Sequence, residues 1–218
     1  MHMTPKHCLI FDLDGTISEP AEGIAGSINY ALQQAGHPPI DHAHISQYIG
    51  PPLDKVFRAI CGDAVDTNGL LDSLVGNYRR HYNDVGYSQN VLFDGIPAAL
   101  EAIRAAGIPM GVCTSKFTDA AVMILEMHGV RSYCDFVSGG DNGMTKSDQL
   151  RALLADGVVS SESIMIGDRA VDITSARANG LRGVGVLYGH GSREELESAN
   201  PLRLLSEPAE FTSLIEVL

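Results

Sequence analysis

The chain has 218 residues, 44% of them hydrophobic, and a formal net charge of −12. This apolar content supports one packed domain with a smaller insert. The acidic balance, with no basic run longer than Arg79-Arg80, argues against a nucleic-acid polymer as partner, and no apolar stretch approaches the roughly 18 residues of a membrane-spanning helix.

The first six residues, Met1 to Lys6, reach an apolar run too soon to hold a secretory signal. Four cysteines without Cys-x-x-Cys spacing are expected to be small buried apolar residues, not a disulfide framework or a zinc site. They are Cys8, Cys61, Cys113 and Cys134. Together these features predict a protein of a reducing, cytoplasmic compartment.

The next segment, residues 8–16, joins an apolar run to two acids and a glycine turn. The near-continuous apolar lead-in is typical of a central parallel strand. Because residues i and i+2 of a strand share a face, Asp12 and Asp14 are expected to leave its end on the same side before Gly15 bends the backbone. Two carboxylates placed in this way indicate a cation and phosphate site, and a surface acidic turn is the alternative.

Residues 19–90 show helical periodicity and no strand. Helices are expected over residues 22–35, from Leu53 to near Gly62, and over the stripe from Leu70 to Tyr82, with a loop at residues 49–53. Consecutive helices without a strand cannot belong to the layered sheet domain. Residues 19–90 are therefore expected to form a helical insert.

From Ile96 an alternation of helices and strands returns. Helices are expected at Ile96 with Pro97 in the first turn, and over residues 119–128, 146–154 and 171–179, with strands over 109–113, 136–137, 163–166 and, as the last one, 183–187. Ser192 and Glu195 indicate a capping box before a short helix. The pattern predicts an α/β fold, a Rossmann-like doubly wound parallel sheet built from residues 1–18 and 91–218.

Polar groups follow three of the expected strands. Asp12 and Asp14 follow the first, Thr114-Ser115-Lys116 another, and Gly167-Asp168, with Asp172 beyond, a third, while Lys146 opens a helix. In an open α/β sheet, ligands bind outside the carboxyl ends of the strands. We therefore expect these groups to converge on one crevice.

This ordered set resembles the haloacid dehalogenase superfamily of phosphatases. Asp12-Leu13-Asp14-Gly15-Thr16 matches its first motif, Thr114 the second, Lys146 the third, and Gly167-Asp168 with Asp172 the fourth. The resemblance covers nearly the whole chain and implies that residues 19–90 are a helical cap. The chain departs from many phosphoglycolate phosphatases at Ser147, where those enzymes place a proline.

The leading acids have distinct expected roles. Asp12, at the end of the strand, is expected to be the nucleophile, because a covalent aspartyl phosphate splits one difficult displacement into two easier ones. Asp14 is expected to protonate the leaving alkoxide and then to deprotonate the attacking water.

A cation is expected beside these acids, because two carboxylates and a phosphate dianion repel one another. The resemblance implies Mg²⁺, held by Asp12, the backbone carbonyl of Asp14 and Asp168. Asp172, about one helical turn beyond Asp168, is expected to ligate the ion directly or through water. The alternative for Asp168 is a helix N-cap.

Four further groups are expected to bind the phosphoryl oxygens. They are the hydroxyl of Thr114, the backbone amide of Ser115, and the ammonium groups of Lys146 and Lys116. The alternatives are that the Thr114 hydroxyl only stabilises a turn and that the Lys146 side chain is solvated.

The substrate is expected to be a small phosphorylated metabolite. Residues 49–52, 114–116, 166–169 and 187–191 together resemble a branch of the superfamily named 5′-nucleotidases, so nucleoside 5′-monophosphates are expected first and 2-phosphoglycolate second. A phosphomutase would share the same catalytic residues, Asp14 disfavours a dehalogenase, and a noncatalytic phosphate-sensing module on the same fold is a further alternative. No membrane partner is expected, and the oligomeric state is left open.

Overall fold

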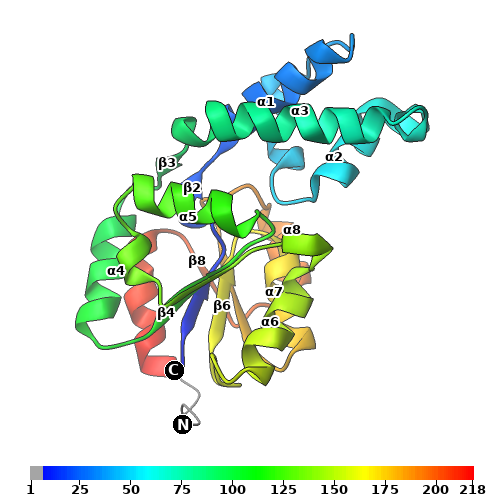
Figure 1. Ribbon diagram of the computed structural model, residues 1–218. Coiled ribbons are helices and arrows are strands. Elements are labelled where there is room, and N and C mark those ends of the chain that lie inside the picture. The colour runs from blue at the N-terminus through cyan, green and yellow to red at the C-terminus, as the bar shows by residue number, and fades with distance from the viewer. Residues whose placement is uncertain (1–6) are drawn as a thin grey trace. The chain divides into compact units, whose positions relative to one another are not determined.

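A computed structural model describes residues 7–218, so the expectation drawn from Met1 to Lys6 lies outside the described residues (Figure 1). The chain divides into two compact units. The core unit contains the described residues up to Glu19 together with Leu92–Leu218, and the helical unit contains Pro20–Val91. Among the helices of the described chain, none combines the length and apolar character needed to cross a membrane.

The core unit is built on a six-stranded sheet in the order β5-β4-β1-β6-β7-β8, in which every recorded strand pair is parallel. The strands are β1 (Leu9–Phe11), β4 (Met110–Cys113), β5 (Phe136–Ser138), β6 (Ile164–Gly167), β7 (Arg182–Val186) and β8 (Arg203–Leu205). β1 lies in the middle, where Leu9 is in register with Met110 on one side and with Ile164 on the other. After β1 the next strand of this sheet is β4, on one side of β1, and after β6 the next strand is β7, which lies in the opposite direction. The strand order therefore reverses beside β1, where the ligand crevice of such a sheet is expected.

Helices cover both faces of this sheet. Figure 1 shows α4 and the C-terminal helical segment η6 on one face and α6 and α7 on the other. Their bounds are α4 (Ile96–Ala105), α5 (Thr118–Met127), α6 (Lys146–Ala155), α7 (Ala170–Ala178), α8 (Arg193–Ser198) and η6 (Pro208–Val217), with short turns η4 (Arg131–Tyr133) and η5 (Asp141–Gly143). This is a doubly wound, Rossmann-like α/β fold, as the sequence predicts.

The apolar run of β1 divides its side chains between the two faces. Ile10 packs with Leu150, Met165 and other residues of the α6 and α7 side, whereas the ring of Phe11 lies 5.1 Å from that of Phe211 in η6. Successive strand residues point to opposite faces, and both faces here are covered. This explains why β1 is hydrophobic without alternation.

The helical unit contains α1 (Ala21–Gln34), α2 (Leu53–Cys61) and α3 (Leu70–Asp84), with η1 (His42–Tyr48), η2 (Gly62–Asp66) and η3 (Gly86–Gln89) between and after them. Two short strands, β2 (Ser18–Glu19) and β3 (Val91–Leu92), form a separate two-stranded sheet. The three expected helices of the insert are confirmed by α1, α2 and α3. Each of their apolar stripes contributes buried residues, including Ile28, Phe57 and Leu74.

Two expectations need correction. The strand near residue 183 is not the last, because β8 pairs with β7 through Val184 and Arg203. β8 has only three residues, of which Leu205 alone is buried, so it carries too little periodicity to be detected. All four cysteines are free thiols, but Cys61 is only half-buried, unlike the other three.

Candidate active site

Asp12 and Asp14 leave the end of β1 where the backbone turns. The amide of Asp12 donates to the carbonyl of Ile166 at 2.8 Å, which continues the pairing with β6 past Phe11. Gly15 then adopts a φ of +81°, and a Cβ atom on it would collide with the Asp168 carboxylate. Only glycine meets both requirements, so the turn brings the first acids against those that follow β6.

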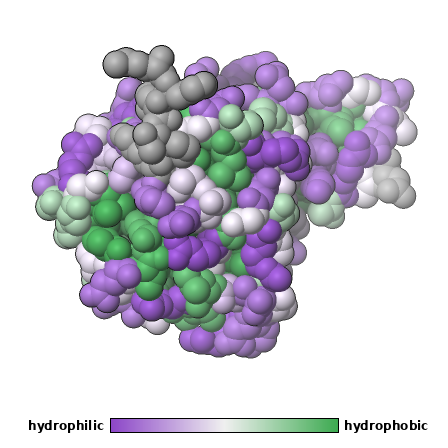
Figure 2. Space-filling model, turned by 90° about the horizontal axis from the view of Figure 1, so that it is seen from below, coloured by the Kyte–Doolittle hydropathy of each residue, from purple (hydrophilic) through white to green (hydrophobic). Residues whose placement is uncertain are grey.

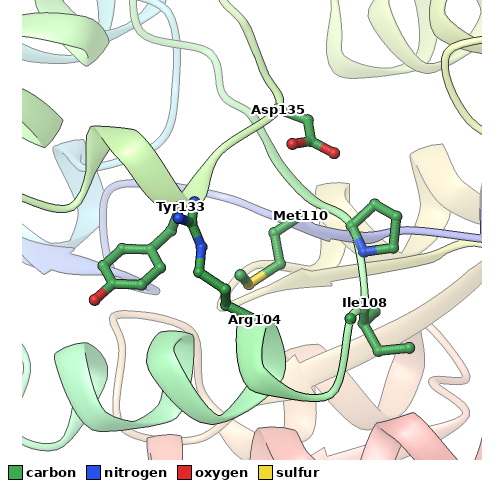
Figure 3. Close-up of a pocket in the computed structure, with 7 residues that line it drawn as sticks. Arg104, Ile108, Met110, Tyr133 and Asp135 are labelled. Atoms are coloured by element: carbon green, nitrogen blue, oxygen red, sulfur yellow. The ribbon is translucent and has the colours of Figure 1, made fainter.

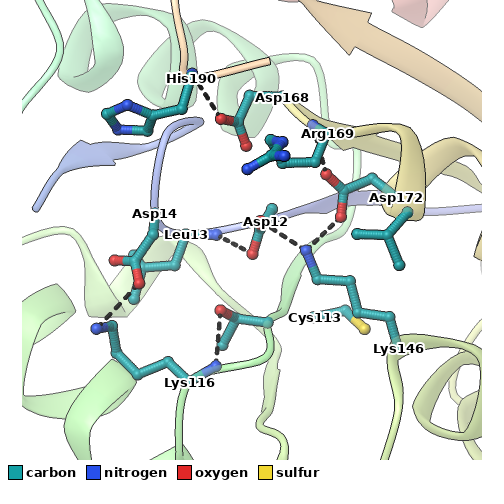
Figure 4. A network of polar contacts seen from close by, with 12 residues as sticks. Asp12, Leu13, Asp14, Cys113, Lys116, Lys146, Asp168, Arg169, Asp172 and His190 are labelled. Carbon is teal, nitrogen blue, oxygen red and sulfur yellow. Dashed lines mark hydrogen bonds and ion pairs between the residues drawn. The ribbon is translucent and has the colours of Figure 1, made fainter. Parts of the chain in front are cut away.

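The ammonium of Lys146 lies between two carboxylates. Lys146 is the first residue of α6, behind a capping box formed by Thr145 and Asp148, and only 4% of its surface is exposed. Its Nζ lies 2.6 Å from Oδ2 of Asp12 and also contacts Oδ1 of Asp172 (Figure 4). Burial would lower the pKa of Lys146, but the two carboxylates hold it above its usual value. The alternative of a solvated lysine is therefore wrong.

Asp168 comes directly after β6, and Asp172 lies in the first turn of α7. Oδ2 of Asp168 accepts from the amide of His190 at 2.8 Å, and Oδ2 of Asp172 accepts from the amide of Arg169 at 3.0 Å. Arg169 is the N-cap residue of α7, so the alternative that Asp168 caps this helix is wrong. Asp168 also precedes the helix, so it and Asp172 are brought together by the turn and not by one turn of helix.

The carboxylates of Asp12, Asp168 and Asp172 form a buried cluster in which one oxygen of each lies within 4.8 Å of the others. Burial, followed by repulsion from Asp172 and Asp12, raises the pKa of Asp168 to about 7. Burial also raises the pKa of Asp172 to about 6, although Lys146 lowers it.

This cluster fits a divalent cation. Three carboxylates and the single ammonium of Lys146 give a net charge of −2 when all are ionised. Oδ1 of Asp168 is buried without a hydrogen-bond partner among the described residues, so a ligand oxygen is left over. Oxygen atoms alone are the donor set of hard cations such as Mg²⁺ and Ca²⁺.

A second ion pair lies on the β4 side of the site. Thr114 is buried directly after β4, its hydroxyl accepts from the amide of Lys116 at 3.3 Å, and Nζ of Lys116 lies 3.0 Å from Oδ2 of Asp14 (Figure 4). Burial raises the pKa of Asp14, while Lys116 lowers it. The half-buried Ser115 lies between Thr114 and Lys116, with its carbonyl against Gly140. Lys116 thus faces Asp14, and the Thr114 hydroxyl lies beside the Lys116 amide.

The loop after β7 lies against Asp168, whereas the sequence indicated residues 187–191 only through their resemblance to the 5′-nucleotidase branch. Besides the His190 amide, Gly189 and Gly191 lie so close to Asp168 that a Cβ atom on either would collide with it. The hydroxyl of Tyr188 donates to the carbonyl of Thr16 at 2.9 Å. Two glycines separated by one residue, a few residues after a strand, are the signal that could have indicated this close approach.

The expected capping box at Ser192 is half correct. The Ser192 hydroxyl accepts from the amide of Glu195 at 3.1 Å, but the Glu195 carboxylate does not return to Ser192. It accepts instead from Nε of Arg169 and from the amide of Ala170, each at 2.9 Å. Two donors at the start of α7, one of them charged, make a better partner than one backbone amide.

A pocket of about 310 Å³ lies away from the acids, at the amino-terminal edge of the sheet (Figure 3). Figure 2 looks at the molecule from below, the side of this edge, where hydrophobic patches on the core unit alternate with hydrophilic ones. The pocket is lined by Met110, the first residue of β4, whereas Thr114 follows the last. At about 3.3 Å per strand residue, the two ends lie roughly 13 Å apart, so this pocket is not part of the acidic site.

Comparison with known proteins identifies relatives of the whole chain. Residues 9–186 match the family described as haloacid dehalogenase-like hydrolases. A 5′-nucleotidase of Pseudomonas aeruginosa is 34% identical over 212 residues, which cover 95% of each chain. A phosphoglycolate phosphatase of Pectobacterium atrosepticum is 30% identical over 98% of this chain and 94% of its own.

Two further similarities concern a longer protein and a solved structure. The tyrosine-protein kinase PtkA of Mycobacterium tuberculosis is 32% identical over 88% of this chain, which spans only 66% of that relative's length. The crystal structure of a predicted phosphatase from Clostridium acetobutylicum superposes with a TM-score of 0.88 at 31% identity, covering 98% of this chain and all of that one.

Proposed function

The chain belongs to the haloacid dehalogenase-like hydrolases, and from this membership and the geometry of its acidic site we propose that it is a Mg²⁺-dependent phosphatase of nucleoside 5′-monophosphates. The observation that carries the proposal is the placement of Asp12 and Asp14 at the end of β1, each in an ion pair with a buried lysine. Two acids held in different environments suit two different roles.

Asp12 is the proposed nucleophile. Its Oδ1 accepts from the amide of Leu13 at 2.7 Å, and Lys146 lies against Oδ2, so both carboxylate oxygens are held in place by donors. One carboxylate oxygen attacks phosphorus, and the bond from phosphorus to the ester oxygen breaks. The product of this step is a phosphoryl group on Asp12 and an alkoxide that needs a proton.

Asp14 is the proposed acid and base. Burial raises its pKa, which favours the protonated carboxyl that the leaving alkoxide requires. In the second half-reaction the resulting carboxylate removes a proton from water, whose oxygen attacks phosphorus and releases Asp12. The proton that Asp14 gives to the alkoxide is replaced by a proton from water, and the phosphoryl group leaves as inorganic phosphate, so one turnover hydrolyses one ester.

The metal would be held by Asp12, Asp168 and the backbone carbonyl of Asp14, with Asp172 ligating directly or through water. When bound, Mg²⁺ offsets the charge of the carboxylates and of the phosphate. Asp172 also has a role without the ion, because its two oxygens fix both the Lys146 ammonium and the amide that begins α7.

Phosphoryl oxygens are proposed to contact the Thr114 hydroxyl, the Ser115 amide and the ammonium groups of Lys116 and Lys146. Removing one such preorganised donor typically costs about 10²–10³ in kcat. The resemblance further implies that the helical unit is a cap.

The choice of substrate rests on the relatives and on the cations of the helical unit. A buried carboxylate, as in 2-phosphoglycolate, would need a paired cation. Lys55, Arg58, Arg79 and Arg80 are all exposed on α2 and α3, and Arg58 is paired with Asp66. These exposed side chains favour a substrate without a second charge to bury, which supports a nucleoside over phosphoglycolate.

A panel of purified-protein assays tests the proposal. Phosphate release is measured for nucleoside 5′-monophosphates, 2-phosphoglycolate and small sugar phosphates in Mg²⁺. Release from nucleotides supports the proposal. Transfer of the phosphoryl group to a second sugar hydroxyl without release of phosphate would assign the chain to a phosphomutase instead.

A further inference from the structure

Gln149 is a buried polar residue of α6 that the catalytic proposal does not use. Only 1% of its surface is exposed. It lies three residues after Lys146, and residues three apart on a helix are neighbours on one face. The same face of α6 therefore carries the Lys146 ammonium and the Gln149 amide toward the carboxyl ends of the central strands.

The side-chain amide of Gln149 is engaged at both of its ends. Its Nε2 donates to the carbonyl of Thr114 at 3.0 Å. Its Oε1 accepts from the hydroxyl of Ser138 at 3.0 Å and from the thiol of Cys113 at 3.4 Å. A backbone carbonyl can only accept, so the contact with Thr114 sets which end of the amide is nitrogen.

These bonds join three elements at one point. Cys113 ends β4 and Ser138 ends β5, while the amide of Thr114 donates to the carbonyl of Ser138 at 2.9 Å. The Thr114 residue is thus held from its amide by β5 and from its carbonyl by α6. A rigid link of this kind fixes the spacing between the Thr114 hydroxyl and the Lys146 ammonium.

We propose that Gln149 is a positioning residue for the phosphoryl site, which sets the Thr114 loop against the helix that carries Lys146. The inference rests on the proposed phosphatase function, because its readout is affinity for phosphate. Groups that bind the phosphoryl oxygens need placement to a fraction of an ångström, and that precision comes from the residues behind them.

Gln149→Met tests this role, because methionine has a similar length and makes none of the three hydrogen bonds. We expect KM for the best substrate and the inhibition constant of inorganic phosphate to rise about tenfold, which corresponds to the loss of about 1.4 kcal/mol of binding, with a smaller change in kcat. The matched control is Leu153→Ala, which removes half-buried packing from the same helix without a polar contact. It should lower the thermal midpoint and leave both constants unchanged.

Gln149→Glu supplies a second test that does not depend on the first variant folding well. A protonated glutamic acid can donate to the Thr114 carbonyl, whereas an ionised one repels it. We expect KM close to wild type at low pH and rising, relative to wild type, as the pH increases.

Three outcomes are distinguishable. Constants within twofold of wild type for Gln149→Met, or a KM of Gln149→Glu that follows wild type at every pH, would overturn the inference. Equal losses in Gln149→Met and Leu153→Ala would also overturn it, because they would show a general loss of stability. A wild-type protein that releases no phosphate would instead contradict the proposed function, and the role of Gln149 would then be measured from stabilisation by inorganic phosphate alone.

Discussion

Nζ of Lys116 lies 3.0 Å from Oδ2 of Asp14, and both side chains are almost entirely buried, with 9% and 12% of their surfaces exposed. The lysine follows β4 and the acid follows β1, so neighbouring strands of the sheet build this ion pair. Lys116 was expected only to bind substrate. Its position gives it a second effect, because it lowers the pKa of Asp14 against the larger effect of burial.

Lys116→Met is therefore predicted to change the pH dependence of the reaction. Without the ammonium the pKa of Asp14 rises further, and Asp14 remains protonated to higher pH. The first step needs the protonated acid, so the alkaline limb of kcat/KM should move to higher pH. Lys55→Met, which removes an exposed lysine of α2, is the control, and an unshifted limb in Lys116→Met would show that the ion pair does not act on the acid.

Activity is predicted to need a small divalent cation. It should be lost in EDTA, return with Mg²⁺ and be poorly supported by Ca²⁺, whose larger and looser ligand shell misplaces nucleophile and phosphate. Asp168→Ala should raise the Mg²⁺ concentration needed for half-maximal rate at least tenfold. Metal titrations of the two proteins measure this, and full activity in exhaustively chelated buffer would refute the metal assignment.

The metal-free protein is predicted to lose stability as the pH rises from about 4 to about 7. Burial raises the pKa of Asp168 to about 7 in the folded chain, so the folded state keeps a proton that the unfolded state has already released. The free energy of unfolding should therefore fall through this window.

The opposite trend is expected for the gain that Mg²⁺ provides. Metal binding needs ionised carboxylates, so the increase in thermal midpoint on adding Mg²⁺ should be larger at about pH 8 than at about pH 5. Asp168→Asn should flatten the pH dependence of the metal-free midpoint. An increase that is equal at both pH values would contradict the assignment.

Local sequence signals were sufficient to predict most of the fold but not the edge strand β8. The apolar run of β1 and the helical periodicity of α3 identify these elements from the sequence, whereas β8 depends on pairing with β7 for its existence. The hydrogen bonds of β8 form only when the sheet assembles. Within β8, Leu205 alone is buried, so one residue is too little to predict a strand from the sequence.

The site shows the same division. Asp12 and Asp14 are detectable because they are two apart at the end of a strand, a relation that is local in sequence. Gln149 is not detectable in this way, because its partners on β4 and β5 become neighbours only when the sheet forms. Likewise, Glu195 has a local cap available but binds Arg169, whose position only the fold determines.

Substrate choice gives the next prediction. The value of kcat/KM for at least one nucleoside 5′-monophosphate should exceed that for 2-phosphoglycolate. Lys55→Ala and Arg58→Ala should leave this ranking unchanged, because both side chains are exposed. A strong preference for 2-phosphoglycolate that collapses in either variant would show that a cation of the helical unit binds the substrate carboxylate.

The two leading acids are predicted to fail at different steps. Asp14→Asn should still form a phosphoenzyme from p-nitrophenyl phosphate, because that leaving group needs little protonation, and should lose about 10²–10⁴ in rate with a nucleotide. Asp12→Asn should form none, because the nucleophile is missing.

The most direct measurement is therefore labelling of wild type, Asp12→Asn and Asp14→Asn by ³²P-labelled p-nitrophenyl phosphate in Mg²⁺, followed by acid quench and counting of protein-bound phosphate. We predict label on wild type and on Asp14→Asn and none on Asp12→Asn. Equal labelling of wild type and Asp12→Asn would contradict the assignment of Asp12 as the nucleophile.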